Sequence, residues 1–240
     1  MTTTNPNTTF NIRRSDERGR TRIGWLDSAH SFSFGRYHDP VNMGYRALRV
    51  INDDRIAPGM GFGEHGHDNM EIISWMLAGA LRHGDSMGHD QLLTPGEAQV
   101  MSAGTGIRHS EFNGSPTDPA HLVQIWIEPD RSGHAPRYGQ KRFAAEDRAN
   151  RFQAIASGRG TGDALSIHQD ADVLVADVAA DGEARYDVAA GRHVYLQVAT
   201  GRVMLNGVEL SAGDAVTTGT AGELRVTGVE ASQVLLFDLV

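Results

Sequence analysis

The 240-residue sequence contains no cysteine, which excludes disulfide bonds, thiolate metal ligands and a cysteine nucleophile. Long apolar runs are also absent. The longest mostly apolar stretch, residues 72–81, contains Ser74 and Gly79 and is too short to cross a bilayer. The first ten residues have neither the basic nor the apolar part of a signal peptide. We therefore expect a soluble, cytoplasmic protein with no membrane partner.

Positive charge is scarce as well, since 22 Lys and Arg stand against 30 Asp and Glu, for a net charge of −8. A polyanion would be repelled at long range, so we expect no direct binding to nucleic acid. The one cluster of arginines, residues 13–22, is interrupted by acidic residues, which favours a solvated face. The sequence does not determine the oligomeric state, and a monomer is compatible with it.

Glycine is abundant instead. The 28 glycines and 8 prolines break the chain into short apolar runs, which predicts an all-β protein. The run LTPGEAQV at 93–100 is matched by LSAGDAV at 210–216, and a glycine-led strand precedes each, at Gly79 and at Gly201. This worn repeat predicts two similar units. Asn206-Gly207 in the second copy predicts a type I′ hairpin turn.

The repeat suggests how the chain divides. We expect an N-terminal domain with the functional site at 10–130, a linker or crossover at 131–165, and a degenerate C-terminal domain at 166–240. The linker is rich in Pro, Gly and Arg, with a short helix predicted at 144–149. Residues 1–9 are predicted to form a disordered polar tail.

Two pairs of candidate metal ligands have their members two residues apart: His65 with His67, and His109 with Glu111. On a strand such residues share one face, roughly 6–7 Å apart. On a helix they would diverge by about 200° and could not share an ion. Two pairs on adjacent strands would bring three imidazoles and one carboxylate together, a first shell suited to a divalent metal.

The spacing around these pairs resembles the two motifs of cupin barrels. The residues that fit them are Gly59, His65, His67 and Glu71 in the first, and Gly106, His109 and Asn113 in the second. Glu71 has the same strand parity as the two histidines, so it could also face the metal. Alternation alone leaves Glu71 and Glu111 open as the carboxylate ligand. The second copy lacks both pairs, and its one candidate, His193, has no partner, so we expect a single metal site.

Other histidines and aromatic residues have more ordinary interpretations. His83 and His89 flank a polar turn and are expected at the surface. The alternation of His30, Phe32 and Phe34 predicts a strand whose ring-bearing face packs in the core, although it could instead form a wall of the metal pocket.

Longer stretches resemble the pirin family, bicupins with a metal-bearing first barrel and a degenerate second one. They are HSFSFGRYHDP, MEIISWMLAGALRHGDSMG after the HGH pair, LTPGEAQVMSAGTGIRHSE, and PRYGQKRF with SIHQDA. The resemblance implies two consecutive cupin barrels and places the ligands on His65, His67, His109 and Glu111. It implies one Fe(II) per chain, while the nitrogen and oxygen donors are also compatible with Zn, Mn, Ni, Co or Cu.

Some bacterial pirin-like proteins are quercetin 2,3-dioxygenases, so the resemblance implies cleavage of a flavonol-like aromatic by O₂. Glu111 would then be ligand and base together. Candidates for an aromatic wall are Phe32, Phe34, Phe62 and Trp75. The alternative is a non-catalytic metal sensor or transcriptional cofactor, as animal pirins are described. Isomerase or hydrolase chemistry on another small molecule is a third hypothesis.

Overall fold

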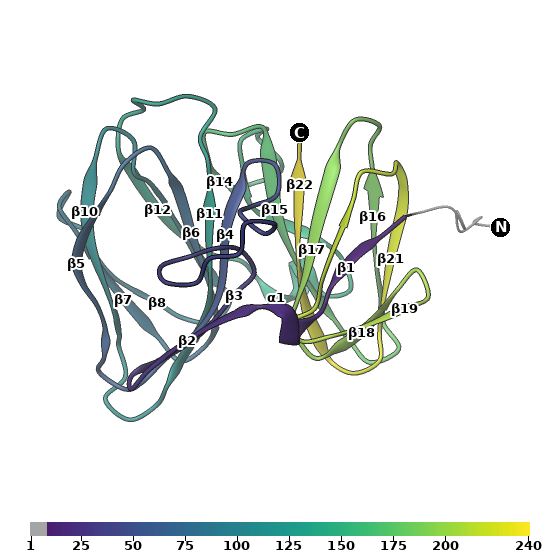
Figure 1. Cartoon of the computed structure of the whole chain (residues 1–240), viewed down its shortest axis with the longest axis horizontal. Coiled ribbons are helices and arrows are strands. Elements are labelled where there is room, and N and C mark those ends of the chain that lie inside the picture. Colours follow the sequence, from purple (N-terminus) through teal and green to yellow (C-terminus); the bar gives the residue numbers. More distant parts are fainter. Residues whose placement is uncertain (1–8) are drawn as a thin grey trace. The chain divides into compact units, whose positions relative to one another are not determined.

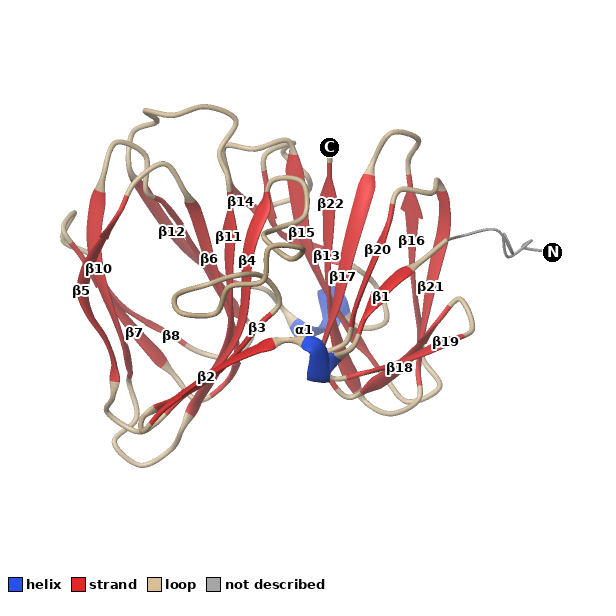
Figure 2. Cartoon of the chain, viewed as in Figure 1, coloured by secondary structure: helices blue, strands red, loops and turns tan. Residues whose placement is uncertain are grey.

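The computed structural model describes residues 9–240, and almost all of its regular structure is strand (Figure 2). The helices are a 3₁₀ turn, η1 (Ser15–Glu17), and α1 (Ala145–Arg148), which lies within the helix predicted at 144–149. The prediction of an all-β protein is confirmed. No helix within residues 9–240 is long and apolar enough to span a membrane. The tail predicted for residues 1–9 lies, except for residue 9, outside the described part of the chain.

The chain divides into two compact units. The N-terminal barrel consists of Arg18–Phe143 and Leu165–Gln169, and the C-terminal barrel consists of the chain up to Glu17, Ala144–Ala164 and Asp170–Val240. Each unit therefore includes a short segment from outside its main stretch of sequence.

The N-terminal barrel has two antiparallel sheets, in the orders β12-β9-β6-β11-β4-β3-β2 and β5-β10-β7-β8 (Figure 1). Its strands are β2 (Gly19–Ile23), β3 (Leu26–His30), β4 (Leu48–Ile56), β5 (Gly61–His67), β6 (Glu71–Ala78), β7 (Leu81–Asp85), β8 (Asp90–Leu93), β9 (Glu97–Ser102), β10 (Ile107–Asn113), β11 (Ala120–Ile127), β12 (Arg137–Arg142) and β14 (Leu165–Ser166). Alternation of buried and exposed residues is clearest in β10, where Ile107, His109, Glu111 and Asn113 all face inward.

The C-terminal barrel repeats this order, with β1-β20-β17-β22-β15-β13 as the larger sheet and β16-β21-β18-β19 as the smaller. Its strands are β1 (Asn11–Arg13), β13 (Gln153–Ser157), β15 (Ala171–Val178), β16 (Glu183–Val188), β17 (His193–Thr200), β18 (Arg202–Leu205), β19 (Val208–Ser211), β20 (Ala215–Thr218), β21 (Gly222–Gly228) and β22 (Ser232–Leu239). In the region expected to link the barrels, β12 pairs with β9 and β13 with β15.

Two glycines occupy equivalent positions in the two repeats. Gly79 before β7 and Gly201 before β18 have φ of +74° and +77°, a backbone conformation that favours glycine. A Cβ on either would meet a carbonyl oxygen at 2.5 Å, that of Pro119 or of Ala231. The predicted type I′ turn is also present, since Asn206 and Gly207 have φ of +46° and +89°.

The interiors of the barrels differ in kind. Counting from these two glycines and following the strand pairing, three inward polar positions of the N-terminal barrel have aliphatic counterparts. The counterparts of His83, His109 and Glu111 are Leu205, Leu224 and Val226. All three lie in one aliphatic core cluster. The barrel fold therefore does not require polar side chains at these positions.

Candidate metal centre

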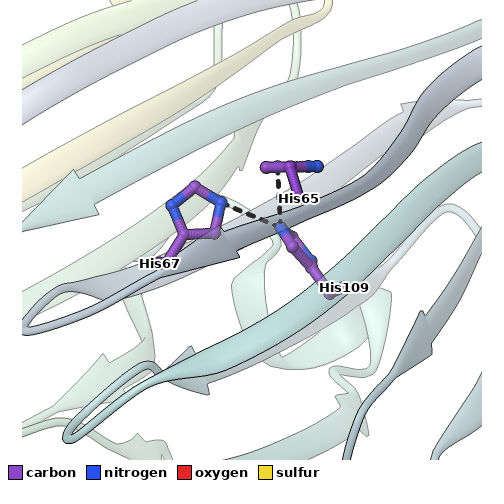
Figure 3. A group of neighbouring side chains, drawn as sticks. All are labelled: His65, His67 and His109. Atoms are coloured by element: carbon purple, nitrogen blue, oxygen red, sulfur yellow. Dashed lines mark hydrogen bonds between the residues drawn. The ribbon is translucent and has the colours of Figure 1, made fainter.

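Three imidazoles converge on the inner face of the smaller N-terminal sheet (Figure 3). His65 and His67 lie on β5, and His109 lies on the neighbouring strand β10, directly opposite His65. The Nε2 atom of His109 is 3.0 Å from that of His67 and 3.1 Å from that of His65. The strand alternation predicted from the sequence thus brings these three residues together.

His67 and His109 are held in their neutral forms. Burial and the neighbouring imidazoles lower the pKa of His67 from 6.5 to about 4 and that of His109 to about 3. His65 donates its Nδ1 proton to the carbonyl oxygen of Gly63 at 2.8 Å, so in the neutral ring Nε2 carries the lone pair. Neutral imidazoles with free lone pairs are the form that binds metal ions.

The three imidazoles are close enough to share one ion. Their ligand nitrogens all lie within 4.8 Å of one another, and two of the separations are 3.0 and 3.1 Å. An ion that takes more than three ligands would have positions left for a carboxylate and a substrate.

Glu111 follows His109 by two residues on β10 and is buried. Two side-chain amides hold its carboxylate: Gln99 donates to Oε1 at 2.6 Å and Gln124 donates to Oε2 at 2.9 Å. The pairing of β10 with β5 shifts register between His109 and Glu111, with the extra residue on β5, so that Glu111 lies opposite Phe62. The carboxylate groups with His109 and His83 rather than with all three imidazoles of the cluster.

Glu71, the alternative carboxylate, lies elsewhere. It is also buried, but it accepts hydrogen bonds from Ser102 Oγ at 2.7 Å and from His168 Nδ1 at 3.1 Å. Residues 9–240 contain two groups of side chains whose ligand atoms are close enough to share an ion. Glu71 belongs to neither of them. Parity had left Glu71 open as a ligand, and β6, which carries it, belongs to the other sheet of the barrel.

The prediction that His83 is a surface residue is wrong. Its side chain is completely buried, and its Nε2 lies 3.1 Å from Asp85 Oδ2. Its ring stacks on Tyr138 with centroids 4.6 Å apart. Leu81, two residues before it, is also buried, so strand alternation would have indicated the inward direction. His89, by contrast, has a side chain 37% exposed.

A cavity of about 410 Å³ opens over the imidazole cluster. One part of its wall is apolar and includes Phe34, Phe62 and Trp126; Trp126 packs edge-on against His67 with centroids 4.9 Å apart. Two predicted wall residues, Phe32 and Trp75, are instead buried in the core. Phe34 and Phe62 are in the predicted place, and Trp126 was missed because β11 is buried on both faces, so alternation does not show which way the side chain points.

A second part of the wall is polar. It is formed by Thr21, Ser28, His30, Asn52, Asp54 and Gln124. His30 thus lines the cavity. Of the two interpretations of its strand, core packing and a wall of the metal pocket, the second holds for this residue. Burial, with the charges of Asp53 and Glu111, raises the pKa of Asp54 to about 7 against the opposing hydrogen bond from Ser28.

The depressed pKa of His67 predicts how the metal-free protein responds to acid. In the unfolded chain this imidazole takes up a proton near pH 6.5, whereas in the fold it does so only near pH 4. Its contribution to stability is therefore present above pH 6.5 and is lost as the pH falls towards 4. Urea unfolding of chelator-treated protein should show a smaller loss between pH 7 and pH 5 in His67→Asn than in wild type. Equal losses would contradict the assignment, and exposed His38→Asn is the control.

The fold and the cluster together define a protein of two consecutive cupin barrels, of which the first carries an imidazole site. Family models agree: the model described as Pirin matches residues 11–127, and the one described as the quercetinase C-terminal cupin domain matches residues 154–239. The chain belongs to the pirin family, as its sequence motifs predicted.

Relatives of known name or structure cover nearly the whole chain. A quercetin 2,3-dioxygenase from Escherichia coli K12 is 45% identical over 228 residues, which are 95% of this chain and 97% of that protein. The crystal structure of YhhW from Escherichia coli has a TM-score of 0.91 at 44% identity, covering 97% of this chain and 98% of that one. A crystal structure of the bacterial pirin YhhW in complex with nickel(II) has a TM-score of 0.90 at 44% identity, covering 96% and 99%.

Proposed function

We propose that this chain is a metal-dependent dioxygenase that cleaves flavonol-type substrates with O₂. The observation that carries the proposal is the convergence of three imidazole Nε2 atoms, 3.0 and 3.1 Å apart, beside a cavity with an aromatic wall. Such a cavity suits a flat aromatic ligand. The substrate class comes from the name of the Escherichia coli relative, quercetin 2,3-dioxygenase.

One divalent ion would be held by His65, His67, His109 and Glu111. We propose Fe(II); three nitrogens and one oxygen also suit Zn, Mn, Ni, Co or Cu, and the related YhhW has been crystallised with nickel(II). When bound, the ion supplies Lewis-acid activation of a substrate hydroxyl and a redox centre for reaction with O₂. Glu111 is the carboxylate proposed for this set because it already groups with His109.

Glu111 is also proposed to accept the proton of the substrate hydroxyl. Its carboxylate is buried beside the cavity, so the proton would pass directly and not through bulk water. The amides of Gln99 and Gln124 orient both carboxylate oxygens before the substrate arrives. The apolar wall around Trp126 would exclude water from the reacting groups.

The test is oxygen-dependent turnover of quercetin by metal-loaded protein. We expect loss of the flavonol absorbance band, with about one O₂ consumed for each carbon monoxide released. Chelation should abolish turnover, and Fe(II) or another divalent ion should restore it. Ser110→Ala is the matched control, because Ser110 lies between His109 and Glu111 on β10 but lines a surface hollow on the other face of the sheet. This variant should keep nearly full activity.

If fully metallated protein neither binds nor turns over any flavonol, the dioxygenase proposal fails. The alternative, a non-catalytic metal sensor or transcriptional cofactor, would then be preferred. Binding without turnover would instead contradict the proposed reaction with O₂ and leave the substrate class unaffected.

A further inference from the structure

The polar wall of the cavity is a network in which most groups satisfy one another. His30 Nδ1 lies 2.7 Å from Asn52 Oδ1, and its Nε2 lies 2.8 Å from Thr21 Oγ1. Because an amide oxygen only accepts, His30 donates from Nδ1 and accepts the Thr21 hydroxyl at Nε2. Gln124 donates to Glu111. The hydrogen-bonding groups of these residues are thus already paired with one another.

Asp54 is the exception in this network. It lines the cavity and is 3% exposed, and its Oδ1 has no hydrogen-bond partner anywhere in the described chain. Its one side-chain hydrogen bond is with Ser28, which lies directly opposite on β3. A buried polar atom without a partner is costly, and such atoms in native proteins call for a ligand, a water molecule or a functional explanation.

A structural role does not account for this carboxylate. The adjacent Asp53, on the opposite face of β4, is the residue that pairs with charged groups: with His121 at 2.7 Å and with Arg55 at 3.1 Å. In the C-terminal barrel the position equivalent to Asp54 holds Ala176, which lies in the aliphatic core. The same strand pairing is therefore made without any polar side chain there.

A second unsatisfied group lies on the same wall. Trp126 lines the cavity, and its buried indole Nε1 has no partner within residues 9–240. In the pairing of β4 with β11, Asp54 lies opposite Leu122 and Trp126 lies opposite Val50, so both face inward. Four residues along a strand separate them by about 13 Å. Trp126 packs against His67, so Asp54 lies at the end of this row away from His67, on the far side of Gln124 and its hydrogen-bonded partner Glu111.

We propose that Asp54 binds a hydroxyl group on the part of the substrate remote from the imidazole cluster. Asp54 and the three imidazoles line the same cavity, so a ligand of several aromatic rings held at the imidazoles can reach Oδ1. Oδ1 would accept a hydrogen bond from the distal hydroxyl. This inference rests on the proposed function and narrows its substrate class to flavonols with hydroxyls on more than the ring nearest the metal.

Anaerobic titration of metal-loaded protein tests this with two ligands. Quercetin has hydroxyls on its outer rings, whereas 3-hydroxyflavone keeps only the hydroxyl beside the carbonyl. Asp54→Leu removes the acceptor at similar volume, and Asp54→Asn keeps an acceptor oxygen. We expect Asp54→Leu to weaken quercetin binding by about tenfold to a hundredfold and 3-hydroxyflavone binding by less than about threefold. Asp54→Asn should keep most of the preference for quercetin.

Metal content and far-UV circular dichroism of each variant are measured alongside. Equal weakening of both ligands in Asp54→Leu would overturn the inference while leaving the proposed function intact. Equal affinity of the wild type for the two ligands would overturn it without any variant, which covers the case of a variant that does not fold. If the wild type binds neither ligand, the inference and the proposed function fail together.

Discussion

Replacing His65 and His109 together by alanine is expected to leave the protein with almost no bound metal. These residues supply two of the three Nε2 atoms that converge at the cavity, and His67 with Glu111 would hold an ion only weakly. The C-terminal barrel offers no substitute at the equivalent positions, where Tyr186 and Leu224 stand in place of His65 and His109. Elemental analysis after dialysis should find about one equivalent in wild type and nearly none in the double variant.

His38→Ala is the control for this experiment, because His38 is exposed and does not line the cavity. It should keep the full equivalent of metal. A double variant that also retained a full equivalent while remaining folded would show that the metal is bound elsewhere. Far-UV circular dichroism establishes whether the barrels are intact.

Replacing Glu111 by glutamine is expected to reduce quercetin turnover by at least about a hundredfold, since a positioned general base commonly contributes about 10² to 10⁴ in rate. Glutamine keeps the shape of the side chain but can neither take a proton nor supply a negative ligand. The retained shape keeps the neighbouring Gln99 and Gln124 in a similar environment. The measurement is kcat with quercetin at saturating metal, together with metal content after dialysis.

Glu71→Gln is the matched control for this prediction. Glu71 is an equally buried carboxylate, but its hydrogen bonds go to Ser102 and His168. Its substitution should change turnover by only a few-fold. In the corresponding alanine variants, the greater loss of metal should follow Glu111. A greater loss in Glu71→Ala would reverse the assignment of the carboxylate.

Local patterns were sufficient for much of the architecture. The period of two in β5 and β10 indicated that His65, His67 and His109 face inward, because side-chain direction on a strand depends only on parity. The glycines at 79 and 201 and the turn at Asn206-Gly207 were recognisable because their backbone conformations are accessible to few residue types. The repeat of these punctuating residues predicted two barrels.

What the sequence by itself determined, then, is the class of fold, its duplication and the three imidazoles, all of which depend on neighbours along the chain. The tertiary structure decided that Glu111 and not Glu71 groups with His109, because β6 and β10 lie in different sheets. It also decided that β1 pairs with β20 and that Asp54 and Trp126 share one wall of the cavity. These features arise from pairing between distant strands, which residue parity within a single strand does not encode.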